Sequence, residues 1–189
     1  MEIERTYRKF NTKDISEIAI FTTLLVICTW INVPMLVPFT MQTFAVFLSL
    51  LILGGRKALL VVSTYILIGA SGLPVFAGFR GGVFVLFGLT GGFIIGFIFQ
   101  CLVYSCVTKF LGEKLYIKVV ALLVGLLVCY VVGAYWFVNV YNLTISNGLE
   151  GNLSFNQAFM LYVAPYIIPD LLKLFLAIRI YSKIKTLIL

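Results

Sequence analysis

Two charged residues lie within an apolar stretch near the end of the chain. Residues 162–179, YVAPYIIPDLLKLFLAIR, form a run long enough to cross a bilayer, yet they include Asp170 and Lys173. Each charge at the centre of a bilayer costs about 2.5–3.5 kcal/mol on insertion scales, and side chains three positions apart on a helix lie on the same face. The pair is therefore either an ion pair within one helix or the polar part of a cavity that holds a small solute.

Two prolines in the same stretch predict a break in this helix. Pro165 and Pro169 each lack a backbone N–H and disfavour helix at the residue before them. Pro169 suits the first position of a new helix, which would place Asp170 at the positive end of the helix dipole. Broken backbone at membrane depth is tolerated where it lines a cavity, so this pattern favours the second interpretation.

The composition predicts an all-α integral membrane protein. The chain has 189 residues, of which 62% are hydrophobic and 11% charged, and its mean hydropathy is +1.11. At about 20 residues per span, residues 1–189 have room for about six transmembrane helices in a single domain. A catalytic or ATP-hydrolysing domain is not expected, and the sequence contains no Walker motif.

Other residue types exclude further classes of function. All four cysteines (Cys28, Cys101, Cys106 and Cys129) fall in apolar runs without ligand spacing, and the chain has no histidine. We therefore expect no metal site, no cofactor and no histidine-based catalysis. The basic residues do not group with aromatic residues as in a nucleic-acid-binding surface, so no nucleic-acid partner is expected.

Apolar runs and their connections define the expected order of elements. The six runs cover approximately residues 15–33, 43–53, 58–71, 93–110, 116–138 and 162–179. Between the third and fourth runs, residues 72–92 are too apolar for a solvated loop and too rich in glycine for a regular helix. We expect this segment to fold back into the protein and line a cavity. Residues 141–157 form the one long polar loop.

The distribution of positive charge predicts the orientation. If both termini are cytoplasmic, 12 of the 14 lysines and arginines lie on the cytoplasmic side. These are Arg5, Arg8, Lys9, Lys13, Arg56, Lys57, Lys109, Lys114, Lys118, Arg179, Lys183 and Lys185. The glycine-rich segment and residues 33–42 then face outward. We expect a multi-pass protein of a bacterial-type cell membrane with a site open to the exterior.

Several residues on the predicted outer side have suitable chemistry for such a site. Arg80, flanked by glycines, can donate to a carboxylate or to a urea-like carbonyl, or it can simply be solvated at the interface. Thr40 and Gln42 can contact a ligand or cap the helix that follows. Thr90 is a further polar candidate. The candidates for apolar lining of the cavity are Phe76, Phe79, Tyr162 and Tyr166.

A pair of small residues in the first run can allow another helix to approach closely. Ala19 and Thr23 are four positions apart and lie on one face of a helix. Such a pair serves either ordinary packing within the protein or docking of a partner helix.

Five spaced motifs resemble those of the BioY family, the biotin-specific S components of energy-coupling factor transporters. They are VPFTMQ at 37–42, GLPVFAG at 72–78, GG at 81–82, GLTGG at 88–92 and PYIIPDLLK at 165–173. The resemblance implies six helices and an outward-facing cavity in which Asp170 and Lys173 bind biotin, with Gln42 and residues 72–92 contributing. It also implies a transmembrane coupling subunit and two ABC ATPases as partners. Ala19 and Thr23 then correspond to the AxxxA pair that docks the coupling subunit.

The chain differs from the family pattern near the expected site. Leu89 stands where proline is usual, Phe93 where tyrosine is common, and Pro169 where glycine is usual. Two other functions remain open from the residues. One is an S component for a different vitamin, and the other is a small intramembrane enzyme that uses Asp170 and Lys173 as an acid–base pair.

Overall fold

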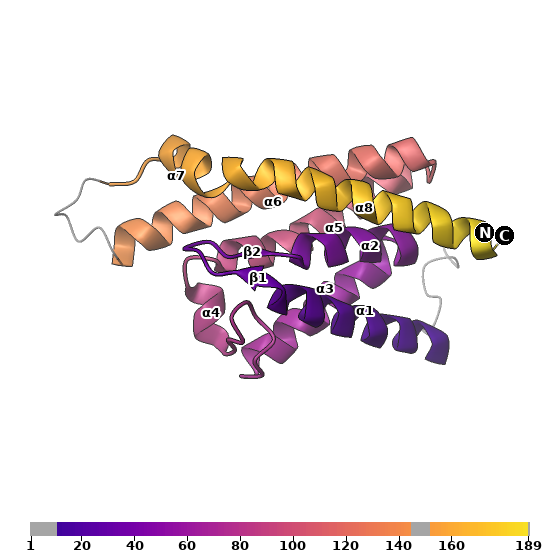
Figure 1. Cartoon of the computed structure of the whole chain (residues 1–189), viewed down its shortest axis with the longest axis horizontal. Helices are drawn as coiled ribbons and strands as arrows, with labels where there is room; N and C mark the ends of the chain where they lie inside the picture. Colours follow the sequence, from indigo (N-terminus) through magenta and orange to yellow (C-terminus); the bar gives the residue numbers. More distant parts are fainter. Residues whose placement is uncertain (1–10, 145–151, 189) are drawn as a thin grey trace, which may run out of the picture.

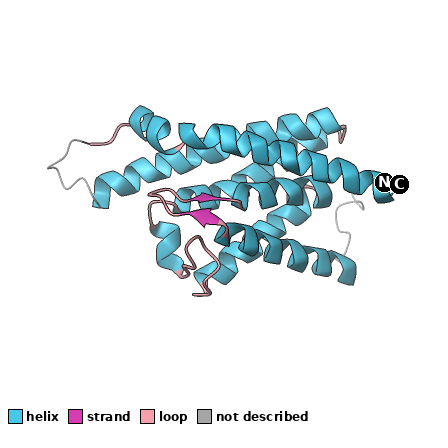
Figure 2. Cartoon of the chain, viewed as in Figure 1, coloured by secondary structure: helices cyan, strands magenta, loops and turns pink. Residues whose placement is uncertain are grey.

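α-Helices account for almost all of the secondary structure (Figure 2). The computed structural model of the chain describes residues 11–144 and 152–188. The helices are α1 (Thr12–Trp30), α2 (Gln42–Leu53), α3 (Gly55–Ala70), α4 (Val83–Phe87), α5 (Gly91–Leu111), α6 (Leu115–Thr144), α7 (Phe155–Tyr162) and α8 (Ala164–Ile188). Two short antiparallel strands, β1 (Asn32–Val33) and β2 (Phe39–Thr40), connect α1 with α2.

The connections between the long helices gather at two ends of the bundle (Figure 1). One end, on the right in Figure 1, holds the start of α1, the α2–α3 and α5–α6 connections and the end of α8. Lys57 there pairs with Asp14 at 2.5 Å and with Glu17 at 2.6 Å. We call this the basic end, because the described residues among the 12 predicted cytoplasmic cations lie in these segments. Arg5, Arg8 and Lys9 fall outside the described residues.

The opposite end carries the segments with irregular sequence. The β1–β2 hairpin, α4 and α7 lie there (Figure 1). α4 occupies part of the glycine-rich segment between α3 and α5. α6 continues to Thr144, beyond the predicted end of its run at residue 138, and α7 begins at Phe155. The predicted polar loop therefore contains helical residues at both ends, and residues 145–151 lie outside the described part of the chain.

The break in the last helical segment is at Val163 and not at Pro169. α7 and α8 lie on either side of Val163 and are bent by 47° relative to each other. Pro169 lies inside α8, so the prediction that it starts a helix with Asp170 at the positive end of the dipole is wrong. An internal proline removes one backbone hydrogen bond. The packing of α8 against α2 stabilises the helix through this position.

Helix length and composition support the membrane class but do not determine the number of spans. Among the described residues, α5 and α6 are each long and apolar enough to cross a bilayer, and α7 with α8 forms a bent pair that also qualifies. α2 is apolar but has 12 residues, which corresponds to about 18 Å against a hydrocarbon core of about 30 Å. The count of six spans therefore stays a prediction.

Glycines allow α5 and α6 to pack closely along each other. A Cβ atom on Gly92 would overlap the Cβ of Trp136, and one on Gly96 would lie 2.8 Å from Sγ of Cys129 and 3.1 Å from its carbonyl oxygen. Gly92 and Gly96 are one turn apart on α5, the spacing that admits a neighbouring backbone in membrane helices. This pair fixes α6, and with it Tyr130, close to the interior of the bundle.

Replacing Gly96 by leucine should lower the free energy of unfolding by about 1–3 kcal/mol or more, because the side chain must displace the backbone of Cys129. Thermal unfolding of the detergent-solubilised protein measures this effect. Cys106→Leu is the matched control, since Cys106 is exposed on the same helix. Equal unfolding temperatures for the two variants would contradict the proposed role of Gly96.

Candidate ligand-binding site

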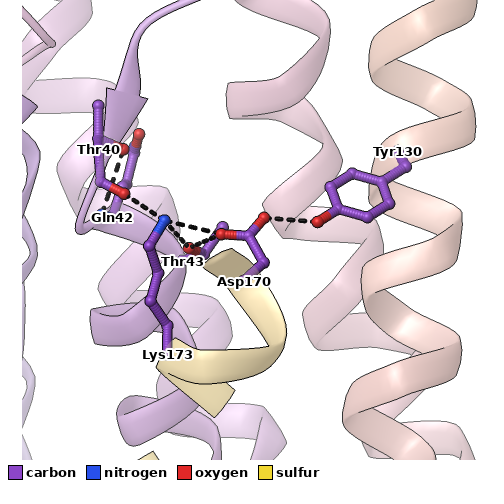
Figure 3. A network of polar contacts seen from close by, with 6 residues as sticks. All are labelled: Thr40, Gln42, Thr43, Tyr130, Asp170 and Lys173. Carbon is purple, nitrogen blue, oxygen red and sulfur yellow. Dashed lines mark hydrogen bonds and ion pairs between the residues drawn. The ribbon is translucent and has the colours of Figure 1, made fainter. Parts of the chain in front are cut away.

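The two charged residues of α8 form a buried ion pair (Figure 3). Nζ of Lys173 lies 2.7 Å from Oδ1 of Asp170, and the residues are 6% and 3% exposed, respectively. A buried charge is stable only when its remaining hydrogen-bonding capacity is satisfied. The partners of each charge therefore decide what the pair can do.

Asp170 accepts hydrogen bonds from two other helices. The hydroxyl of Thr43, in the first turn of α2, donates to Oδ1 at 2.8 Å. The hydroxyl of Tyr130, on α6, donates to Oδ2 at 2.5 Å. With the ammonium of Lys173, the carboxylate thus joins α2, α6 and α8 at one point (Figure 3).

All three N–H groups of the Lys173 ammonium have acceptors. They donate to Oδ1 of Asp170, to the carbonyl oxygen of Thr40 at 2.6 Å and to the hydroxyl of Thr43 at 3.2 Å. The ammonium also lies 4.0 Å from the centre of the Phe39 ring, a cation–π contact. A ligand that accepts from Lys173 must replace one of these contacts, and the bond to Thr43 is the longest.

The chain reversal between β2 and α2 presents these acceptors to α8. The Thr40 hydroxyl accepts from the backbone N–H of Gln42 at 3.2 Å, which leaves the Thr40 carbonyl for Lys173. The Gln42 side chain turns away from the ion pair and donates from Nε2 to the hydroxyl of Tyr65 at 3.1 Å. Thr40 thus supports the start of α2 and contacts the ion pair at the same time.

Two adjoining cavities lie beside the ion pair. The first is lined by Val37, Pro38, Thr40, Gln42, Thr43, Phe93, Phe97, Cys129, Tyr130, Tyr162, Tyr166, Asp170 and Lys173. The second is lined by Val37, Pro38, Thr40, Gln42, Tyr65, Phe76, Ala77, Arg80, Val85, Thr90, Phe93 and Ile94. Five of the lining residues belong to both cavities, so the two adjoin, and we call them together the depression; its wall is mainly apolar and the ion pair forms a charged corner of the first cavity.

Residues 37–39, next to both cavities, contact α8 through Tyr166. The hydroxyl of Tyr166 donates to the carbonyl oxygen of Val37, and its ring stacks on that of Phe39 with centroids 6.2 Å apart. Tyr166 itself lines the first cavity. These contacts connect the wall formed by the β1–β2 hairpin to the helix that carries the ion pair.

The structure brings most of the predicted site residues to this depression. Asp170, Lys173 and Tyr162 line the first cavity, and Arg80 and Thr90 line the second. The residues that line both include the predicted pair Thr40 and Gln42. Residues 72–92 were expected to line a cavity, and five of them (Phe76, Ala77, Arg80, Val85 and Thr90) line the second one.

Phe79 is placed differently from the other predicted residues. It is 61% exposed, its ring contacts that of Trp30 in a tilted arrangement with centroids 5.0 Å apart, and it is not one of the described residues that line either cavity. Its backbone has a φ of 56°, a conformation that costs energy for a residue with a side chain. Phe79 therefore packs the loop between α3 and α4 against the end of α1.

Sequence reasoning missed Thr43 and Tyr130, whereas Tyr166, a candidate for apolar lining, lies in the wall of the first cavity. Thr43 directly follows Gln42 and contacts α8 through Asp170. Its position next to Gln42 in the sequence did not indicate this contact. Tyr130 lies in the middle of an apolar run, where a buried hydroxyl needs a partner. That requirement was a usable signal, although it does not identify Asp170 as the acceptor.

A solved structure shares this architecture. The fold matches that of a solved structure described as the crystal structure at 2.1 Å of the S-component for biotin from an ECF-type ABC transporter. The TM-score is 0.79, the match covers 98% of this chain and 95% of that chain, and 19% of the aligned residues are identical. The chain thus has the fold of a transporter S component.

The sequence comparison then gives the family. The BioY family profile matches residues 4–189. The chain is 37% identical over 169 residues to the biotin transporter BioY of Thermotoga maritima, which covers 89% of this chain and 93% of that protein. It is 35% identical over 176 residues to the probable biotin transporter BioY of Pyrococcus horikoshii, with 93% and 98% covered. This chain belongs to the BioY family.

Proposed function

We propose that this protein is the biotin-binding S component of an energy-coupling factor transporter, a membrane transport subunit and not an enzyme. The observation that carries the proposal is the Asp170–Lys173 pair in the wall of the two-part depression of a BioY-family chain. Intramembrane ionisable residues that face a cavity mark binding sites. The relatives that share most of the chain length are described as biotin transporters.

The chemistry of biotin complements this depression. Its ureido ring has N–H donors next to a carbonyl acceptor, and Asp170 and Lys173 present an acceptor and a donor 2.7 Å apart. The tetrahydrothiophene ring and the aliphatic chain suit the aromatic wall formed by Phe93, Phe97 and Tyr162. Arg80 lines the second cavity and is exposed, so its guanidinium is suited to the carboxylate end of the ligand.

Calorimetric titration of the purified protein tests the proposal. Biotin should bind, whereas thiamine and riboflavin should not. The primary amide of biotin keeps the ureido ring but lacks the negative charge, and it should bind more weakly because it no longer pairs with Arg80. Tight binding of another vitamin without binding of biotin would overturn the assignment, and chemical conversion of the bound ligand would instead support the intramembrane enzyme.

The proposed membrane arrangement has six spans, formed by α1, α2, α3, α5, α6 and the α7–α8 segment. The basic end faces the cytoplasm with both termini, because lysine and arginine are retained on that side. The end with the β1–β2 hairpin, α4 and α7 then faces outward, and the depression opens to the exterior. The hairpin precedes α2 directly and supplements its short length at membrane depth, where backbone that lines a cavity is tolerated.

Cysteine labelling should show this orientation directly. In a variant without the 4 native cysteines, a cysteine at Asn152 should react with a membrane-impermeant maleimide in intact cells, because it precedes α7 at the outward end. A cysteine at Lys183, near the end of α8, should react only after lysis. The reverse pattern would invert the proposed topology, and loss of biotin binding in either variant would disqualify it as a probe.

We further propose that a coupling subunit docks on α1 and that two ABC ATPases supply the energy. Ala19 and Thr23 are both exposed in the described structure, and the Thr23 hydroxyl donates to the carbonyl oxygen of Ala19 at 3.0 Å. The hydroxyl is therefore satisfied within the helix and leaves a small, smooth surface. Exposure of both residues supports docking of a partner rather than packing inside this chain.

A further inference from the structure

A third cavity lies at the basic end, which is opposite the end that carries the β1–β2 hairpin, α4 and α7. It has a mainly polar wall. Its lining comes from the last turn of α2 (Leu51, Ile52 and Leu53), Gly54, the start of α3, the end of α5, the α5–α6 connection and the first turn of α6. The residues that matter for its chemistry are Gly55, Tyr104, Thr108, Glu113 and Lys118.

Tyr104 supplies a hydrogen-bonding group that the protein leaves unused. The residue is 1% exposed, and its hydroxyl has no hydrogen-bond partner among the described residues. Leaving a buried hydroxyl unpaired costs about 1–3 kcal/mol. Tyr104 lines the cavity together with Glu113. An acceptor bound in the cavity would satisfy this group.

Lys118 places a weakly compensated cation in the same wall. It is 8% exposed, and its ammonium has only long contacts in the described structure, at 3.4 Å to the Tyr181 hydroxyl and 3.5 Å to Glu113. Buried cations require close partners. Glu113 is a poor one, because its side chain is 81% exposed and can turn toward water.

The start of α3 adds a third source of positive potential. α3 begins at Gly55 on the cavity wall, and the preceding residue, Gly54, has no side chain to cap it. The N–H groups of a first helical turn have no acceptor within the helix, and they attract anions. A Cβ on Gly55 would overlap Oγ of Ser105, so the residue also allows this helix end to lie directly against α5.

We propose that this cavity binds an anion of the phosphate class. The ligand oxygens would accept from the Tyr104 hydroxyl, the Lys118 ammonium and the start of α3. Phosphate has the several acceptor oxygens that such a set of donors needs, and basic pockets between helices at the cytoplasmic interface bind lipid head groups. The source is either a phospholipid head group or free phosphate.

Lipid binding to the purified full-length protein tests the first source. Native mass spectrometry with dioleoyl phosphatidylglycerol should show retained lipid, whereas dioleoylglycerol, which lacks the phosphate, should not be retained. Tyr104→Phe and Lys118→Met should each weaken retention about tenfold or more, which is the loss expected for one hydrogen bond that involves a charge. Lys114→Met is the matched control, since Lys114 is exposed on the α5–α6 connection, four positions before Lys118, and does not line the cavity.

Two further measurements distinguish a phospholipid head group from free phosphate. Thermal protection of delipidated protein by inorganic phosphate, relative to chloride at equal ionic strength, would identify free phosphate if Tyr104→Phe abolishes it. Glu113→Gln should strengthen binding of either ligand, because it removes the competing carboxylate. Tyr104→Phe deletes one oxygen and preserves the fold. If this variant and the wild-type protein retain lipid and respond to phosphate equally, the cavity does not bind anions.

Discussion

Replacing Asp170 by asparagine should weaken biotin binding about 10- to 100-fold and should also destabilise the folded protein. The loss of affinity corresponds to about 1.5–3 kcal/mol, as expected for a hydrogen bond to a charged group. The loss of stability follows because Lys173, at 6% exposure, loses its buried counterion. Breaking a buried pair in this way costs about 3–5 kcal/mol. Calorimetric titration with biotin and thermal unfolding in detergent measure the two effects.

The double variant Asp170→Asn with Lys173→Met separates the role in binding from the role in folding. Removal of both charges should restore most of the stability, but the affinity for biotin should stay low if the pair contacts the ligand. Tyr130→Phe is the milder control, because it removes one donor to Asp170 and leaves the ion pair intact. Recovery of both stability and affinity in the double variant would show that the pair serves only the fold.

Replacing Ala19 by tryptophan should reduce ATP-driven biotin uptake to background while biotin binding to the isolated protein stays close to normal. The indole would occupy the small surface of α1 and prevent the close helix approach that association in lipid requires. Since Ala19 is exposed, the substitution should not disturb the interior of this chain. Uptake in cells that also produce the coupling subunit and the ATPases, together with co-purification of these subunits, measures the effect.

A tryptophan on another exposed surface provides the control for this experiment. Leu102, on α5, is 46% exposed, and Leu102→Trp should leave uptake and assembly unchanged. If Ala19→Trp loses biotin binding together with assembly, the α1 surface supports the fold of this chain. If the variant retains both uptake and assembly, the coupling subunit docks elsewhere.

The sequence alone was sufficient to select the two central residues of the site. Charges are so costly in an apolar run that Asp170 and Lys173 stand out without any structure. Arg80, Thr40 and Gln42 were selected because polar and glycine-rich segments interrupt the runs, and the structure places all three at the adjoining cavities. Phe79 was selected only as one aromatic residue among many, and it lies outside them.

The partners of the ion pair could not be predicted in the same way. Thr43 and Tyr130 are 127 and 40 positions away from Asp170 along the chain. Local patterns report which side chains share a helix face, but they do not report which helices become neighbours. Contact between α2, α6 and α8 depends on packing of complete helices, for example the close approach that Gly96 permits between α5 and α6.

By itself, the sequence determined the helical membrane class, the approximate helical runs, the clustering of positive charge at one end and the position of the charged pair. These properties follow from hydropathy and charge, which act residue by residue. The position of the break at Val163 and the continuation of α8 through Pro169 were decided only in the tertiary structure. A proline lacks one backbone hydrogen bond, and next to it α8 packs against α2, where Thr43 donates to Asp170. Such contacts exist only once the bundle has assembled.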